Sequence, residues 1–436
     1  MKDRRVFFNP AKFPFFYGYA IVLFATLGIW SSLPGQTVGV STFTDPVIKS
    51  LQLNRDLFST AYMAGTLLSS FFISAAGRWF DKYGARKVAF ASAMVLSLSL
   101  FVASYSHIIS GSIQSALSFE HWSIPFSVIT LLFFLFRFSG QGVLTLSSRN
   151  MVMKWFDRYR GKVNAFTALS VALGFSISPL LIDKLIQTYQ WDGAWRIMGA
   201  TLLIMAIVIL VFYRDNPEQY GLKPDGGKIN SDDDNKREKK DRDFTPSEAF
   251  ATRVFWIYSL MLAYNSFFIT GFTFHVVSVF ESVGYERSQA ISIFVPLSVV
   301  SVIVSLTFNF LSDKIYLKTL LYIMIGGGFI AAAGLTMLSI SYGIYMIIVG
   351  LGISGGLFSV LNAVAWPRLF GRKHLGAVSG KAMSMVVFAS ALAPILFSLS
   401  YTRLDTYSAV GLVAFVFMIF MLVGALRANN PRLLQN

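Results

Sequence analysis

Arg137 is the side chain whose surroundings point most directly to chemistry, because it lies inside a long apolar run. A charge near the middle of a membrane-spanning stretch is costly and usually functional. The acidic residues nearest to the middle of a run, such as Asp183 and Glu281, fall at run ends. Water, backbone carbonyls or a bound anion must therefore satisfy the guanidinium donors, and the planar guanidinium suits a carboxylate. Arg137 is thus a candidate for binding an anion, and a purely structural role is the alternative.

Other polar side chains inside apolar runs are candidates for contacting a small molecule. Lys381 lies about five residues into its run, so it either extends to the interface or faces a cavity. His275 is the candidate for proton coupling, because an unperturbed histidine titrates near neutrality, and a hydrogen-bonded structural histidine is the alternative. The neutral candidates for substrate binding are Gln36, Thr37, Gln141 and Asn265.

The composition places these residues in a membrane protein. Of the 436 residues, 55% are hydrophobic and 14% are charged, and the mean hydropathy is +0.59, which is too apolar for a soluble domain. A helix needs roughly 20 apolar residues to cross the hydrocarbon layer, and twelve such runs predict an all-helical fold. A bend is expected in the first run at Pro34-Gly35. The approximate runs are 17–40, 57–76, 86–106, 124–148, 161–186, 194–213, 254–281, 289–311, 318–340, 343–366, 376–400 and 406–427.

The distribution of cations predicts the orientation in the membrane. The net charge is +15, and most of the 37 Lys and Arg residues fall in loops on the same side as the N-terminal Met1–Arg5. The loops of the other side contain only Lys49, Arg55, Lys184, Arg196, Arg287 and Arg403. Since cations concentrate on the cytoplasmic side, we expect a multi-pass protein of the plasma (inner) membrane with both termini in the cytoplasm. The first run is too long for a cleavable signal peptide and is expected to act as an anchor.

A polar linker joins two halves of similar organisation. Residues 1–213 and 251–436 are predicted to form two six-helix bundles, and residues 214–250 a charged cytoplasmic linker with the core SDDDNKREKKDRD. Pro179 and Pro394 occupy matching places in the two halves, as expected for the internal repeats of transporters. The linker is expected to be a solvated tether, with a regulatory tail as the alternative.

A polar hairpin, GRWFDKYGARK, is predicted between the second and third runs. Its glycines and charges resemble the loop 2/3 signature of the major facilitator superfamily of secondary transporters. The matching residues are Gly77, Asp81, Lys82, Gly84, Arg86 and Lys87. In the second half, NFLSDKIYLK keeps Asp313 but has Asn309 in place of the glycine. Gly84 is expected to adopt a positive φ, and Asp81 to accept hydrogen bonds from N–H groups at a helix start and to pair with a cation.

Further stretches extend the resemblance over most of the chain. RFSGQG around Arg137 is similar to the family's helix 4 motif, and KWFDRYRGKVNAF and NPEQYGLKPDG resemble the monocarboxylate and oxalate/formate branch. The resemblance implies two pseudo-symmetric bundles that transport by alternating access. It also implies that the hairpin residues and Asp313 form a latch that stabilises the outward-open state, whereas a role in topology alone is the alternative.

The expected function is secondary active transport of a small organic anion, coupled to protons or working by exchange. The alternatives are efflux of amphipathic compounds, which the 42 Phe and 15 Met residues favour, and a receptor or scaffold that binds without transport. No HExxH, paired carboxylates or nucleophile–base spacing indicates an enzyme, and the four histidines are scattered. We expect no metal, no cofactor and no nucleic-acid partner, and a monomer that takes a small-molecule substrate in the lipid bilayer.

Overall fold

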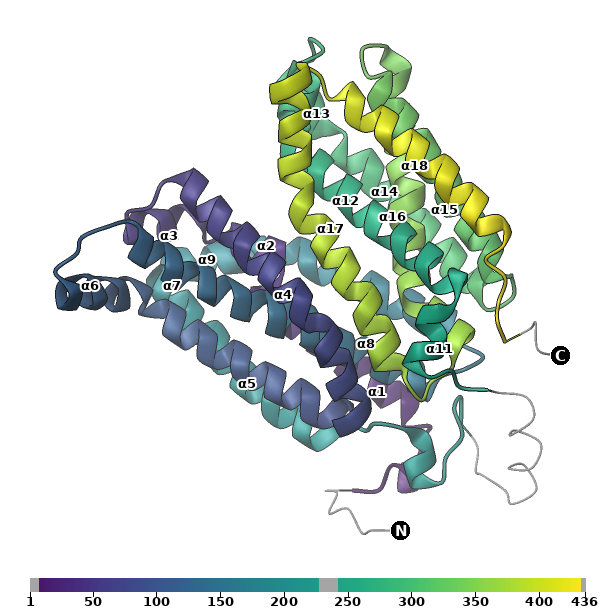
Figure 1. Ribbon diagram of the computed structural model, residues 1–436. Coiled ribbons are helices and arrows are strands. Elements are labelled where there is room, and N and C mark those ends of the chain that lie inside the picture. Colours follow the sequence, from purple (N-terminus) through teal and green to yellow (C-terminus); the bar gives the residue numbers. More distant parts are fainter. Residues whose placement is uncertain (1–7, 227–241, 433–436) are drawn as a thin grey trace. The chain divides into compact units, whose positions relative to one another are not determined.

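The computed structural model of this protein describes residues 8–226 and 242–432, and the regular elements among them are all helical (Figure 1). This result confirms the predicted all-helical class. Two stretches used in the sequence analysis, Met1–Arg5 and residues 231–241 of the charged linker, lie outside the described residues.

The chain divides into two compact units. One comprises Met1–Asp157 and Ser170–Asn235, and the other comprises Arg158–Leu169 and Lys236–Asn436. The short segment Arg158–Leu169 is therefore grouped with the second half of the chain. The domain bounds predicted on either side of the linker remain a prediction.

The first unit contains α1 to α8, drawn from purple to blue in Figure 1, and most of α9. Its elements are η1 (Pro10–Lys12), α1 (Gly18–Ser31), η2 (Leu33–Gly35), α2 (Thr37–Ser41), α3 (Thr44–Leu51), α4 (Arg55–Tyr83), α5 (Ala85–Ser104), α6 (Ser106–Leu117), α7 (Ser123–Phe136), η3 (Arg137–Leu144), α8 (Thr145–Trp155), most of α9 (Arg160–Phe212) and η4 (Pro217–Tyr220). The first residues of α9 lie in the segment that groups with the second unit.

The second unit contains the green and yellow helices of Figure 1. Its further elements are α11 (Pro246–Ala251), α12 (Arg253–Glu281), α13 (Arg287–Ser292), α14 (Phe294–Ser312), α15 (Leu317–Thr336), α16 (Ser341–Phe370), α17 (Leu375–Leu404) and α18 (Ser408–Leu426).

The helices account for the predicted membrane spans. Among the described residues, ten helices are long and apolar enough to cross a membrane, as judged by length and composition. One of them, α9, has 53 residues, about twice the length that one crossing needs. Gln190, at φ 62° and ψ 170°, interrupts its helical backbone and divides it into two spans. With the 14-residue α1, these helices correspond to the twelve apolar runs.

The first predicted run, 17–40, is not one continuous helix. α1 ends at Ser31, a 3-10 turn occupies Leu33–Gly35, and Gln36 has an extended backbone before α2 begins. Pro34 has no N–H group and therefore cannot continue the helical hydrogen bonds. The bend that the sequence predicts at this point is confirmed, and it takes the form of a complete break.

A close backbone contact connects this break to the span formed by α7, η3 and α8. η3 is a π-helical stretch, and such wide turns are frequent at functional sites. A Cβ atom on Gly35 would overlap the carbonyl oxygen of Phe136 and lie 2.8 Å from the α-carbon of Gly140. Both glycines are therefore needed for the two backbones to touch, and the contact places Arg137 beside the broken helix.

The predicted polar hairpin is helical on both sides of a single residue. α4 continues to Tyr83 and α5 follows directly after Gly84, so the structure corrects the predicted loop to a one-residue turn. Gly84 has a φ of +84°, which confirms the expected positive value. The carboxylate of Asp215 packs against Gly84 where a Cβ would lie, and it accepts a hydrogen bond from the Arg86 backbone N–H at 3.1 Å.

Two aspartates fix the described ends of the charged linker. The Asp225 carboxylate accepts hydrogen bonds from the Asp157 backbone N–H at 3.1 and 3.2 Å. The Asp243 carboxylate accepts from the backbone N–H groups of Arg372 and Lys373 at 2.7 and 3.3 Å. Hydrogen bonds to a charged acceptor are stronger than neutral ones. The linker is thus attached to the loop after α8 in the first unit and to the loop before α17 in the second.

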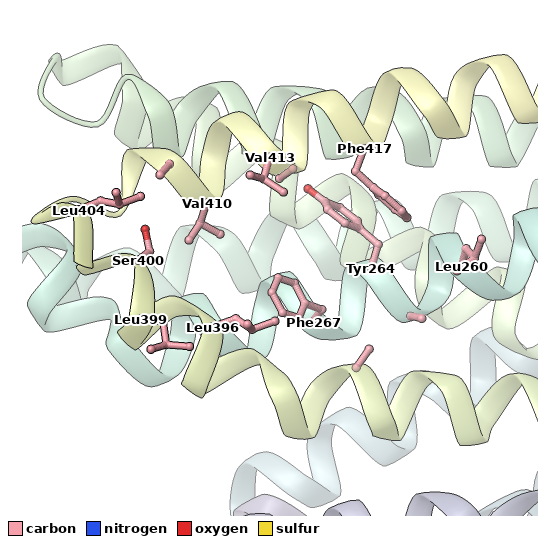
Figure 2. Close-up of a pocket in the computed structure, with 14 residues that line it drawn as sticks. Leu260, Tyr264, Phe267, Leu396, Leu399, Ser400, Leu404, Val410, Val413 and Phe417 are labelled. Carbon is pink, nitrogen blue, oxygen red and sulfur yellow. The ribbon is translucent and has the colours of Figure 1, made fainter. Parts of the chain in front are cut away.

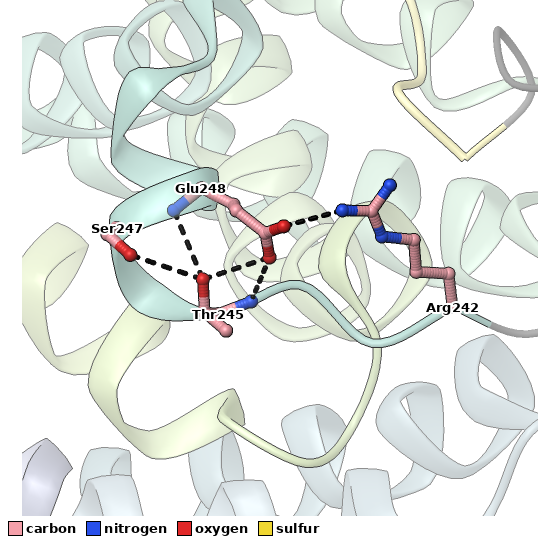
Figure 3. Close-up of polar contacts among 4 residues, drawn as sticks. All are labelled: Arg242, Thr245, Ser247 and Glu248. Atoms are coloured by element: carbon pink, nitrogen blue, oxygen red, sulfur yellow. Dashed lines mark hydrogen bonds and ion pairs between the residues drawn. The ribbon is translucent and has the colours of Figure 1, made fainter.

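Figure 3 shows how the helices of the second unit begin after the linker. Thr245 Oγ1 accepts a hydrogen bond from the Glu248 N–H at 3.3 Å, and the Glu248 carboxylate accepts from the Thr245 N–H at 2.8 Å. This reciprocal pair is a capping box at the start of α11. The hydrogen bond from the Thr245 backbone N–H is the largest cause that lowers the pKa of Glu248, and the Thr245 side chain is the second. Arg242 pairs with the same carboxylate at 2.5 Å.

Gly84→Ala tests the contact with Asp215. Alanine is strained at φ +84° and ψ 162°, and its Cβ would overlap the carboxylate. Because backbone strain of this kind costs about 1–3 kcal/mol, we expect a lower apparent Tm in thermal unfolding of the purified protein. Gly221→Ala is the control, since Gly221 also has a positive φ of +72° but faces no atom within 4 Å. Equal losses in the two variants would contradict a special role for the Asp215 contact.

Candidate functional site

Neutral oxygen atoms hold Arg137 in the first unit. Its side chain is 3% exposed, and Nη1 donates hydrogen bonds to the Gly35 carbonyl oxygen at 3.1 Å and to Thr37 Oγ1 at 3.3 Å. The guanidinium also lies over the Tyr62 ring, 5.2 Å from the centroid, which is a cation–π contact. Nε is buried without a partner, and no carboxylate among the described residues pairs with Arg137. The arginine therefore keeps its positive charge uncompensated.

The broken first helix supplies the carbonyl group that Arg137 uses. In a continuous helix the Gly35 carbonyl would accept from the Gly39 N–H. Here the Gly39 N–H donates to the Gln36 carbonyl instead, at 3.1 Å, so the Gly35 oxygen is released from the helical pattern. A backbone group without a partner is expensive inside a membrane. Arg137 and Gly35 thus satisfy each other.

The polar residues around Arg137 form a group that we call the Arg137 cluster. Its members are Ser32, Gln36, Thr37, Tyr62, Arg137, Gln141 and Thr145. Gln36 Nε2 donates to Ser32 Oγ at 3.0 Å and to Thr145 Oγ1 at 3.3 Å. The Tyr62 hydroxyl donates to Thr37 Oγ1 at 2.9 Å, while Gln141 Oε1 is buried and has no partner within residues 8–226 and 242–432. The structure thus brings together the predicted residues Arg137, Gln36, Thr37 and Gln141.

The sequence analysis missed three members of this cluster, Ser32, Tyr62 and Thr145. Single hydroxyl groups are common in apolar helices, where they usually bond to the preceding turn. Thr145 Oγ1 instead reaches Ser32 Oγ at 3.1 Å, which only the fold reveals.

Arg149 is a further cation that the sequence analysis did not select. The predicted run stopped at Ser148, whereas the span continues through α8 to Trp155. The side chain of Arg149 is half-buried and makes no hydrogen bond or ion pair with the described residues. The apolar sequence Met151-Val152-Met153 after Arg149 does indicate that the span continues past Ser148.

His275 lies in α12 of the second unit and has a defined hydrogen bond. Its Nε2 lies 2.8 Å from the Pro394 carbonyl oxygen, and because a carbonyl only accepts, Nε2 is the donor. The ring is parallel to that of Phe397, with centroids 6.4 Å apart. The site for a second proton is therefore Nδ1, and the proton-coupling role stays a prediction.

Asn265 and Lys381 are the other predicted residues of the second unit. Asn265 is buried in α12, and Lys381 is half-buried in α17. Neither side chain makes a hydrogen bond or ion pair with the described residues. No hydrogen bond joins Asn265, His275 or Lys381 to another of these three among the described residues, so a shared role in substrate binding stays a prediction.

Asp313, whose latch role stays a prediction, binds the backbone at the start of a helix. It accepts hydrogen bonds from the backbone N–H groups of Gly161 and Lys162 at 2.8 and 3.2 Å, at the start of α9. The positive end of a helix favours a carboxylate at this position. Burial raises the pKa of Asp313, and the two N–H groups oppose that shift. Close by, the Asn164 amide donates to Asn309 Oδ1 at 2.7 Å, so the asparagine that replaces the family glycine has a partner of its own.

The hairpin residues lie at the α4–α5 turn of the first unit. Gly77 is buried in α4, Lys82 lies 5.1 Å from the Tyr83 ring centroid, and Lys87 is exposed. The Arg86 backbone N–H at the start of α5 is bound by Asp215, a carboxylate that the sequence analysis did not predict for this position. The proposed latch role of Gly77, Asp81, Lys82, Gly84, Arg86 and Lys87 stays a prediction.

Known proteins resemble this chain over parts of its length. It is 24% identical over 215 residues to the uncharacterized MFS-type transporter YhjX of Escherichia coli (strain K12), which covers 49% of this chain and 46% of that protein. It is 28% identical over 135 residues to MFS-type transporter 1 of Ophiocordyceps sp. (strain BCC 1869), covering 30% of this chain and 26% of that protein. The chain thus matches less than half the length of these relatives.

Solved structures share the fold at low sequence identity. A double Trp mutant of XylE, which another structure describes as a proton:xylose symporter, has a TM-score of 0.63 at 16% identity and covers 94% of both chains. A variant of the E. coli fucose:proton symporter FucP has a TM-score of 0.62 at 10% identity, covering 95% of this chain and 99% of that one. At such identities these structures show the fold alone. A family model, however, matches residues 15–394 directly, and by that match this chain belongs to the Major Facilitator Superfamily.

Proposed function

We propose that this protein is a secondary transporter that carries a small organic anion of the monocarboxylate type across the plasma membrane by alternating access. The observation that carries the proposal is a charge imbalance: Arg137 lies near the middle of its span, and Arg149 and Lys381, within two turns of the ends of their spans, make no ion pair with the described residues. The acidic residues of the described spans are Asp56, Asp81, Asp183, Asp192 and Glu281, each within about two turns of a helix end or of the Gln190 break. An anionic substrate would supply the missing negative charge.

The Arg137 cluster has the chemistry that a carboxylate needs. Arg137 has a donor, Nε, without a partner, and a guanidinium binds carboxylates through charge-assisted hydrogen bonds. Gln141 Oε1 is an acceptor without a partner, which suits a donor group such as a hydroxyl on the same substrate. A buried polar atom left unpaired costs about 1–3 kcal/mol, so a ligand that pairs with both atoms binds favourably.

An uncharged sugar is the second candidate substrate. XylE and FucP are sugar symporters by name, and the amide and hydroxyl groups of the Arg137 cluster suit sugar hydroxyls. A sugar would leave the charges of Arg137 and Arg149 uncompensated in the membrane. We therefore favour the anion.

Coupling to protons or exchange of anions completes the proposal. His275 is the proposed proton carrier, since Nδ1 remains for a proton while Nε2 holds Pro394. We further propose that both termini are cytoplasmic, that a monomer suffices for transport, and that the chain catalyses no chemical reaction.

Removing the charge of Arg149 tests the anion proposal. In proteoliposomes, we expect saturable uptake of at least one of lactate, pyruvate, formate and oxalate. We propose that Arg149, which makes no hydrogen bond or ion pair with the described residues, donates to the substrate carboxylate. Losing a hydrogen bond to a charged group costs about 1.5–3 kcal/mol, so Arg149→Gln should raise the KM about 10–100-fold. Arg149→Lys is the matched control, because it keeps the charge and should retain more of the affinity.

Two results would overturn the anion proposal. One is saturable xylose uptake that Arg149→Gln leaves unchanged, with no flux of any anion. The other is ligand binding without flux under any gradient, which would instead indicate a receptor that does not transport.

His275→Gln tests proton coupling. A glutamine can still donate a hydrogen bond to the Pro394 carbonyl, but it does not take up a proton. We expect an inward proton gradient to stimulate uptake in the wild type by several-fold and to have no effect in the variant, while counterflow exchange continues in both. Equal stimulation in the two proteins would assign the proton to another group and leave His275 a structural role.

Asp313→Ala tests the proposed latch at the start of α9. Loss of the carboxylate removes the acceptor for Gly161 and Lys162, so amide hydrogen exchange in this segment should rise about tenfold or more. Asp313→Asn keeps an acceptor oxygen without charge and should give an intermediate exchange rate. Unchanged exchange in both variants would show that the carboxylate does not hold this helix start.

A further inference from the structure

A cavity of about 560 Å³ lies inside the second unit, between α12, α17 and α18 (Figure 2). Drug-sized ligands occupy pockets of about 300–1,000 Å³, so the cavity is large enough for a small molecule. It is separate from the Arg137 cluster, which lies in the first unit, and from His275 and Lys381, which do not line it.

Small side chains create this cavity. Ala263 in α12, Ala389 in α17, and Ala409 and Ala414 in α18 all line it. The remaining lining side chains are apolar except for Tyr264 and Ser400, and include Leu260, Phe267, Val410 and Phe417. The Tyr264 ring stacks against that of Phe417 with centroids 5.5 Å apart, which forms a rigid wall. The space is therefore suited to an apolar molecule.

One polar side chain that lines the cavity has no hydrogen-bond partner among the described residues. The Ser400 hydroxyl donates to the Thr406 carbonyl oxygen at 2.7 Å and is satisfied. The Tyr264 hydroxyl is buried and bonds to none of the residues that the structure describes, and Tyr264 is only 8% exposed. Figure 2 shows its oxygen directed toward Val413, into the space between α12 and α18. A buried hydroxyl normally finds a partner, so this donor indicates a ligand with a hydrogen-bond acceptor.

The mouth of the cavity opens at side chains that face outward from the helices. Leu404 is 61% exposed and Val413 is 71% exposed, and both belong to the lining. Because α18 is long and apolar enough to cross a membrane, the outward-facing Val413, six residues into it, is placed to face hydrocarbon. This opening suits a ligand that enters from the lipid phase. An ionic ligand is excluded, because the walls offer no charge to pair with it.

We propose that this cavity is a binding site for a small uncharged apolar molecule that carries a hydrogen-bond acceptor, such as a ketone, and that binds Tyr264 through this acceptor. The site does not depend on the nature of the transported substrate. A hydrocarbon chain without an acceptor would fill the same space but leave the Tyr264 hydroxyl unpaired. The test must therefore distinguish such a chain from a ligand that carries an acceptor.

Photolabelling of the full-length protein with benzophenone tests this site. The excited ketone takes a hydrogen atom from a nearby C–H group, and the two radicals then join, so the label marks its own position. In nanodiscs we expect the labelled peptides to come mainly from α12, α17 and α18. Tyr264→Phe keeps the ring and removes only the hydroxyl, and it should reduce this labelling about fivefold, the value of one ordinary hydrogen bond.

A matched pair of competitors separates acceptor recognition from simple filling. Dicyclohexyl ketone should displace the label at about fivefold lower concentration than dicyclohexylmethane in the wild type, and Tyr264→Phe should remove the difference. Ala389→Leu fills the cavity, so it should reduce benzophenone labelling when no competitor is added. Labelling spread evenly over all lipid-facing helices, or equal competition by the two compounds in the wild type, would overturn the proposal.

Discussion

A backbone carbonyl without a helical partner is the group on which the polar centre of the first unit depends. The Gly35 oxygen is free because Pro34 breaks the first span, and Arg137 reaches it because two glycines let the backbones touch. Neither group is tolerated in a membrane alone, since each carries unsatisfied polarity. The broken helix, the π-helical η3 and the buried arginine therefore depend on one another. Loss of any one of them would leave a polar group of another without its hydrogen-bond partner.

Carboxylates serve a different purpose in this chain. Asp215, Asp225, Asp243 and Asp313 each accept backbone N–H groups at a turn or at the start of a helix. At such places a negative charge meets the positive end of a helix or the N–H groups of a turn and is partly solvated. Among the described residues the acidic groups of the spans lie near helix ends, and Arg137 and Arg149 pair with no carboxylate, so these two arginines keep an uncompensated charge. The same separation orders the connections and is the basis on which we propose an anionic substrate.

The sequence predicts the helical spans well, because apolar runs of this length have few other solutions. It also predicts a bend at Pro34, since proline removes a backbone donor. It fails where a helix continues through polar residues: α4 extends to Tyr83, and α8 carries Arg149. The hydropathy of the sequence falls at these polar residues, although the packing of the buried residues beside them still stabilises the helix.

Contacts between distant parts of the chain are the second thing that the sequence does not reveal. Asp215 follows the hairpin glycine Gly84 by more than a hundred residues, yet its carboxylate occupies the space that a side chain would need. Tyr62 joins Arg137 from another helix in the same way. Such partners carry no motif, because a single aspartate or tyrosine is common, and only the packing of the helices selects it.

The two candidate ligand sites follow the same rule, that an unpaired buried group specifies its ligand. Arg137 is held by neutral oxygens, so its hydrogen bonds are partly satisfied while its charge is not, and on this ground we propose an anion as its ligand. A carboxylate in place of Thr37 would neutralise the arginine and remove the reason for an anion to bind. Tyr264 lies in apolar walls and offers a donor without charge, so an anion there would lose its hydration and gain one hydrogen bond. The charge already present in each site therefore decides which ligand it accepts, and the two sites do not compete for the same molecule.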